Sequence, residues 1–169
     1  MTLKGKKIFL ALSVIIPIMA YCFYYYGMMV KNAPYKFTEF KYLVFEYGYG
    51  DSLQNKYNSK THEYQYVNSK DSVVKTTLKL NKDDLLYLHR KAADLGFWNF
   101  PSNELNDADG KLDPEVPHYK IAFYYARKSK SVIFAANYNG NPTLKDANER
   151  LIKEIQKVIT IADERNKKK

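Results

Sequence analysis

The sequence predicts an α+β fold, with an N-terminal transmembrane helix followed by an antiparallel sheet of four to five strands and two helices packed on one face. Three observations predict it: one long uncharged apolar segment, several stretches that alternate with period two, and two stretches with apolar residues at helical spacing. Hairpins give antiparallel pairing, and amphipathic helices need a sheet face to cover. The expected parts are a basic N-terminal tail (1–7), the transmembrane helix or uncleaved signal anchor (8–30), a linker (31–36), a single α+β domain (37–163) and a charged C-terminal tail (164–169).

The apolar segment 8–30 contains 23 residues and no charge. As a helix it would span about 34 Å, which exceeds the hydrocarbon thickness of about 30 Å. Tyr24 to Tyr26 lie near its end, where aromatic residues meet the membrane interface. Pro17 can kink a transmembrane helix without preventing it. We therefore expect residues 8–30 to contact membrane lipid.

Two alternatives to an uncleaved anchor remain for this segment. A signal peptidase could cut near Ala20 and release a secreted form, but ten largely apolar residues would then be left in water. A lipoprotein signal could use Cys22, although Tyr21 stands where such signals require a small residue. The pattern favours the anchor over both.

Orientation depends on the charges that flank the segment. Lysines lie on both sides, at Lys4 to Lys7 and again at Lys31, Lys36 and Lys41, so the positive-inside comparison is nearly balanced. A short basic tail ahead of a long domain is typical of a signal anchor. We predict a cytoplasmic N-terminus and an extracytoplasmic domain.

The pattern after residue 36 predicts the order of elements in the domain. Residues 51–60 are polar and read as a loop, and residues 102–117 show no periodicity and read as an exposed loop. The expected strands are 40–49, 62–68, 73–80, 119–125 and 132–138.

Capping signals place the two helices. Asn81 with Asp84 three residues later predicts a helix start, and Gly96 predicts its end. Thr143 with Asp146 predicts the start of the last helix by the same logic. The aromatic turn at 97–100 is expected to close the core at the end of the first of these helices.

Composition argues against nucleic acid as a partner. The net charge is +9, but six of the lysines belong to the two termini, and without them the balance is +3. Lysine outnumbers arginine 23 to 4, whereas planar phosphate recognition favours arginine. The 16 tyrosines and 9 phenylalanines instead favour a sheet and exclude a largely disordered chain.

An acidic stretch from Asp107 to Asp113 invites a calcium interpretation. In an EF-hand register Asp107 and Asp109 would take the third and fifth positions. The first and twelfth positions would then be Leu105 and Val116, neither of which carries a carboxylate. We therefore expect no metal and no cofactor.

Catalytic motifs are missing from the sequence. The chain has no Gly-x-Ser-x-Gly motif, and its single cysteine lies in the apolar segment. No histidine among His62, His89 and His118 has a metal-ligand partner at i+2 or i+4. We predict no catalytic residues, with an enzyme built on His89, His118 and Asp113 as the alternative.

The tyrosines suggest an interaction surface. Aromatic side chains on the outer face of a sheet can stack on a ligand or peptide, although cross-strand packing explains many of them without one. The expected surface comprises Tyr47, Tyr64, Tyr66 and Tyr124. The leading hypothesis is a membrane-anchored, non-enzymatic envelope protein whose domain binds another envelope protein through its sheet face or its loop 102–117. The alternatives are an enzyme and a structural subunit of a membrane assembly.

Three short stretches carry a resemblance to a known group of proteins. They are Leu95-Gly-Phe-Trp-Asn-Phe-Pro101, Pro117-His-Tyr-Lys-Ile121 and Ser129-Lys-Ser-Val132, followed by a helix. This layout resembles small exported bacterial domains of unknown function, over roughly residues 72–163. The resemblance implies a hairpin–helix–hairpin–helix fold and a location in the bacterial envelope, and it implies no activity.

Overall fold

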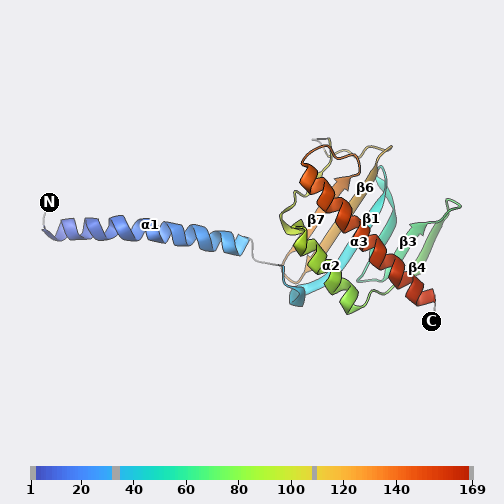
Figure 1. Ribbon diagram of the computed structural model, residues 1–169, viewed down its shortest axis with the longest axis horizontal. Coiled ribbons are helices and arrows are strands. Elements are labelled where there is room, and N and C mark those ends of the chain that lie inside the picture. The colour runs from blue at the N-terminus through green and yellow to red at the C-terminus, as the bar shows by residue number, and fades with distance from the viewer. Residues whose placement is uncertain (1–2, 32–34, 108–109, 168–169) are drawn as a thin grey trace. The chain divides into compact units, whose positions relative to one another are not determined.

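The computed structural model describes residues 3–31, 35–107 and 110–167 (Figure 1). The chain divides into two compact units, Met1–Pro34 and Tyr35–Lys169. The first contains helix α1, and the second contains the sheet and the other two helices.

Helix α1 (Leu3–Lys31) is 29 residues long and continues through Pro17. Its stretch Lys7–Tyr25 is long and apolar enough to cross a membrane. Large apolar side chains such as Phe9 and Phe23 are exposed along it, and such a helix needs lipid or protein to cover it. Its length, composition and place near the N-terminus fit either a membrane span or a signal sequence.

Seven strands form one mixed sheet in the order β4-β3-β2-β1-β6-β7-β5. Neighbouring strands are antiparallel except for β5, which pairs parallel with β7. The strands are β1 (Phe40–Tyr49), β2 (Ser52–Asn58), β3 (Glu63–Val67), β4 (Val73–Thr77), β5 (Asn103–Glu104), β6 (Pro117–Tyr125) and β7 (Ser129–Ala135).

The prediction of four to five antiparallel strands was wrong, because two strands lie in segments that were expected to be loops. In β2 the side chains of Gln54 and Lys56 are exposed, so the segment has the composition of a polar loop. Tyr57, the next residue of the same strand, is only 1% exposed. Strand β5 has two residues, too few to show any periodicity. Its parallel pairing with β7 makes the sheet mixed.

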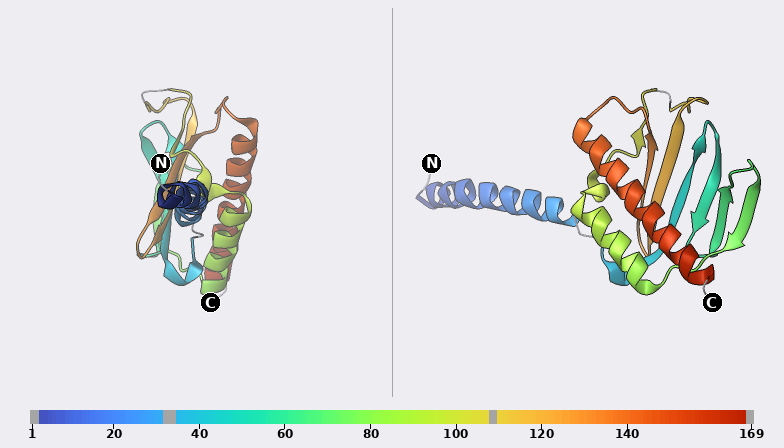
Figure 2. Two further views of the ribbon diagram at one scale, coloured as in Figure 1. Left: turned by 90° about the vertical axis from the view of Figure 1, so that its left-hand side faces the viewer. Right: turned by 45° about the vertical axis from the view of Figure 1, so that its right-hand side comes forward.

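Both helices of the domain, α2 (Lys82–Asp94) and α3 (Pro142–Lys167), cover the same face of the sheet, as predicted (Figure 2, left). Asn81 Oδ1 accepts a hydrogen bond of 2.8 Å from Asp84 N, and the Asp84 carboxylate accepts one of 3.0 Å from Asn81 N. This reciprocal capping box fixes the start of α2. Gly96 adopts φ +76° just after the helix, a left-handed conformation that favours glycine.

Helix α3 begins two residues earlier than expected and extends further. Asn141 rather than Thr143 caps it, since Asn141 Oδ1 accepts a bond of 2.9 Å from Thr143 N. Pro142 takes the first helical position, where its missing N–H costs nothing. The helix runs to Lys167, so the expected charged tail is helical that far, and Arg165 pairs there with Asp84 of α2.

The core lies between the sheet and the helices. Leu43, Phe45 and Phe123 from the sheet and Leu151 and Ile155 from α3 are 0–1% exposed. The aromatic turn after α2 closes this core as predicted, with its first and last phenylalanines buried. Its tryptophan ring stacks on the Tyr35 ring with 4.4 Å between centroids.

No helix covers the opposite face in the described part of the domain (Figure 2). Glu46 on this face forms an ion pair of 3.4 Å with Lys120 of the neighbouring strand. At the end of the face where β6 begins, the chain between β5 and β6 folds over the strands and creates a cavity.

Candidate functional site

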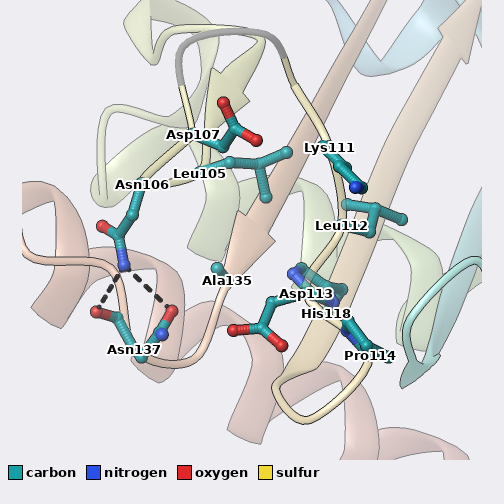
Figure 3. A pocket seen from close by; sticks show the side chains of 10 residues that line it. All are labelled: Leu105, Asn106, Asp107, Lys111, Leu112, Asp113, Pro114, His118, Ala135 and Asn137. Carbon is teal, nitrogen blue, oxygen red and sulfur yellow. Dashed lines mark hydrogen bonds between the residues drawn. The ribbon is translucent and has the colours of Figure 1, made fainter.

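A cavity of about 530 Å³ lies between the β5–β6 connection and the adjoining ends of β6 and β7 (Figure 3). We call the described residues 105–107 and 110–114 the hood, and the space that they cover the hood cavity. Its lining residues are Leu105, Asn106, Asp107, Lys111, Leu112, Asp113, Pro114, His118, Ala135 and Asn137.

One end of the hood is fastened to the turn after β7 by a single amide. Asn106 Nδ2 donates to the Asn137 carbonyl oxygen at 3.0 Å and to Asn137 Oδ1 at 3.1 Å. Asn106 Oδ1 accepts a hydrogen bond of 2.9 Å from Asn139 N. Both ends of the Asn106 amide are therefore used to hold the hood in place (Figure 3).

The other end of the hood forms a tight turn before β6. Asp113 Oδ1 accepts a hydrogen bond of 2.9 Å from Glu115 N, and the Asp113 carbonyl accepts one of 3.2 Å from Val116 N. Figure 3 shows the Asp113 carboxylate turned inward from the hood, toward the strand that carries Ala135. The turn thus places a carboxylate inside the cavity.

His118 lies on the wall of the hood cavity. It faces the side of the sheet that the helices leave uncovered, between Gly48 of β1, which has no side chain, and Ala135 of β7, which has only a methyl group. The residue is 1% exposed, and no hydrogen bond of acceptable geometry reaches its Nδ1. A buried polar atom without a partner is costly, and this one belongs to a side chain that lines the cavity.

Burial lowers the pKa of His118, while Asp113, the Val116 carbonyl and Asp51 act in the opposite direction. Burial is the largest effect, because it disfavours the charged ring. The imidazole is therefore neutral at pH 7, with one nitrogen as donor and the other as acceptor.

Gly48 allows the strands to pass closely beside His118. A Cβ at this position would lie 2.7 Å from the Ser52 carbonyl oxygen and 2.9 Å from Gln54 N. The β1–β2 pairing shifts register between Tyr47 and Tyr49, around this glycine. A side chain here would push β2 away from the end of the sheet that holds the site.

The side chains that line the cavity suit binding better than catalysis. Leu105 and Leu112 supply apolar walls, and Asp107 and Asp113 supply carboxylates. Serine, threonine and cysteine are absent from the described lining, so no hydroxyl or thiol nucleophile accompanies His118. The arrangement can hold a ligand by charge, by hydrogen bonds and by apolar contact.

Three of the four predicted tyrosines lie together, but away from the hood cavity. Tyr47 and Tyr64 line a cavity of about 210 Å³ beside α3, on the helix-covered face. The Tyr66 ring lies 5.0 Å from the Tyr64 ring. Burial is the main cause that raises the pKa of Tyr64 to about 12. All three rings are partly buried, and the Tyr47 ring stacks on the Tyr119 ring instead, with 5.8 Å between centroids.

Tyr124 lies on the opposite face of the sheet from the other three tyrosines. Its ring stacks on the Tyr42 ring with 4.3 Å between centroids. Lys60 Nζ lies 5.4 Å from the centre of the Tyr42 ring. The four predicted tyrosines therefore do not form one continuous surface.

The two histidines of the enzyme alternative, His89 and His118, are also separated. His118 and Asp113 line the same cavity. His89 is 8% exposed on α2, where its Nδ1 lies 2.8 Å from the Tyr125 hydroxyl on the helix-covered face. His62 lies in the β2–β3 turn with φ +62°. His118 and Asp113 therefore lie in one site, whereas His89 and His62 lie elsewhere in the domain.

The structure describes only part of the acidic stretch 107–113 that was considered for calcium. Asp107 and Asp113 line the hood cavity, whereas Asp109 lies outside the described residues. Within the described ranges, no three His, Cys, Asp or Glu side chains are grouped to hold a metal ion.

A buried acid beside the hood was not predicted. Glu104 on β5 is 0% exposed and accepts a hydrogen bond of 2.6 Å from Asn148 Nδ2 on α3. Asn148 interrupts the apolar stripe of α3 between Leu144 and Leu151, which was a readable signal of a buried polar residue. Glu104 stands in an aperiodic segment and gave no signal.

Comparison with protein-family models and with curated protein sequences found no match to this chain. The resemblance to small exported bacterial domains therefore stays a prediction.

Proposed function

We propose that the protein is a membrane-tethered, non-enzymatic binding module, in which the hood cavity contacts another envelope protein. Residues 8–30 are the anchor in the lipid, the N-terminus lies in the cytoplasm and the domain lies outside it. The single observation that carries the proposal is the buried His118 imidazole, whose Nδ1 has no partner, in the wall of a cavity of about 530 Å³.

The tether is supported by α1. Residues 8–30 of this helix carry no charge, and an apolar stretch of this length is stable in a bilayer or against an apolar partner. The lysines on the two sides nearly balance, and the layout of a short basic tail ahead of a long domain favours a cytoplasmic N-terminus.

The binding role is supported by how the hood is built. The two ends of the hood are hydrogen-bonded through Asn106 and Asp113, so the cavity is preformed rather than created by a ligand. Preformed cavities with apolar walls and a few convergent polar groups are typical of binding sites.

Site-specific photo-crosslinking in the native organism tests the proposal. A photoreactive phenylalanine analogue replaces Leu112 in the hood, and in a matched control it replaces Val73, which is 50% exposed on β4. We expect one discrete protein adduct from position 112 and none from position 73. Equal adducts from both positions, or no adduct from position 112, would contradict the proposal.

A further inference from the structure

We propose that the hood cavity receives the lysine or arginine side chain of a basic segment of the partner protein. This inference rests on the proposed binding function and names the chemistry of the partner at the same site. It follows from the charge of the hood, its apolar walls and the unpaired nitrogen of His118.

The hood is a locally acidic part of a basic chain. Between Leu105 and Val116 the sequence contains one lysine and four carboxylates, although the whole chain has a net charge of +9. Asp107 and Asp113 line the cavity together with Lys111. The lining therefore carries two carboxylates against one ammonium, a balance that favours a cation.

The apolar walls suit the stem of a long cationic side chain. Leu105, Leu112 and Pro114 line the cavity beside the carboxylates. Lysine and arginine bury their methylene groups along apolar surface and direct the charged group to polar partners. A small inorganic cation would leave these apolar walls unused, and an anion would meet two carboxylates.

The polar end of the cavity can accept hydrogen bonds from such a head group. Figure 3 shows His118 beside the inward-facing Asp113 carboxylate. The ammonium of lysine and the guanidinium of arginine carry only donors, whereas a carboxylate and a neutral imidazole nitrogen are acceptors. Asp113 supplies the charge, and the neutral His118 ring, which has one donor and one acceptor nitrogen, supplies a further acceptor.

Methyl NMR of the full chain in lipid nanodiscs tests the inference. The chain carries ¹³C-methyl leucine, and the probes are Nα-acetyl-lysine amide and Nα-acetyl-arginine amide, with uncharged Nα-acetyl-norleucine amide as the matched control. We expect saturable shifts of the Leu105 and Leu112 methyl signals with the two cationic probes and none with norleucine. Equal binding of the norleucine probe, or no response to either cation, would overturn the inference.

Two charge-neutral variants sharpen the test. Asp113→Asn keeps an oxygen for the bond from Glu115 N but removes the charge, and we expect about fivefold weaker binding of both cationic probes. Asp71→Asn makes the same charge change in the β3–β4 turn, at φ +54° where asparagine is well tolerated, and should leave binding unchanged. Unchanged binding by Asp113→Asn would overturn the inference.

The two proposals fail in different ways. If position 112 crosslinks to a partner but neither cationic probe binds, the binding module stands and the cationic side chain is wrong. If neither a crosslink nor probe binding occurs, the hood cavity is not the binding site.

Discussion

Asn148 Nδ2 donates a hydrogen bond of 2.6 Å to Glu104 Oε2 and thereby joins α3 to the edge strand β5 inside the core. The same Nδ2 donates to the Leu144 carbonyl at 3.0 Å, which fixes the orientation of the amide. Glu104 Oε1 and Asn148 Oδ1 have no partner. Two acceptors lack a donor here, and a proton on the Glu104 carboxyl would supply one. The hood begins at the next residue, Leu105.

This pair predicts a pH dependence of stability. Burial raises the pKa of Glu104 to about 7, although Lys130 and Asn148 act in the opposite direction. The unfolded carboxyl titrates near its ordinary value of 4.5, so the folded state binds the proton more tightly. Its stabilisation is complete below about pH 4.5 and is lost as the pH rises through about 7. We expect the free energy of unfolding to fall by on the order of 2–3 kcal/mol across this window.

Urea denaturation of the full chain in mild detergent measures this loss, with the fluorescence of Trp98, the single tryptophan, as the signal. Glu104→Gln is the matched control, because its amide keeps an acceptor for Asn148 Nδ2 and adds a donor for Oδ1. The difference between the two proteins should show the step between pH 4.5 and 7. If the variant retains the same step, Glu104 is not its source.

Asn148→Ala should destabilise the domain by about 1–3 kcal/mol, because it leaves the buried carboxyl without its donor. The effect should be larger at pH 8 than at pH 5, since the ionised carboxylate needs the bond more. Asn99→Ala, at an exposed position, should change stability by no more than about 0.5 kcal/mol. If the stability lost in Asn148→Ala is the same at both pH values, the Asn148 hydrogen bond does not depend on the ionisation of Glu104.

Gly48→Ala should destabilise the domain by about 1–3 kcal/mol, because the new Cβ would meet backbone atoms of β2 at 2.7 Å. Gln54→Ala, at an exposed site on β2, serves as the comparison. Urea denaturation measures both variants. A stability of Gly48→Ala equal to that of the parent would mean that β2 can move away from this position without cost.

The orientation of the domain can be measured by thiol labelling. In a Cys22→Ser background, Ser69→Cys places one thiol in the exposed β3–β4 turn. We expect a membrane-impermeant maleimide to label it on intact cells. Labelling only after lysis would place the domain in the cytoplasm. An intact protein mass that matches a chain starting after Ala20 would show that the segment is cleaved.

Local signals predicted the helices well because capping chemistry is contained in a few adjacent residues. Asn81, Asp84 and Gly96 fixed the bounds of α2 before any tertiary contact was known. At α3 the same reasoning chose Thr143 instead of Asn141, since both are good capping residues. Pro142 takes the first helical position, which makes the preceding residue, Asn141, the cap.

The two missed strands and the site depend on contacts that are distant in sequence. Strand β5 exists because Asn103 and Glu104 lie beside β7, about thirty residues later in the chain. The hood cavity brings Asn106 to Asn137 and Asp113 to His118, and no spacing rule links these positions. Alternation placed Tyr47 and Tyr64 on one face, but it did not show that α3 would partly cover them.

Hydrogen exchange of the full chain in nanodiscs, with and without the crosslinking partner, measures whether the partner binds at the hood. We expect partner binding to slow exchange in residues 105–118, where the hood and the start of β6 lie, and to leave β3 and β4 unchanged. Protection confined to β3 and β4, with no change in the hood, would contradict it.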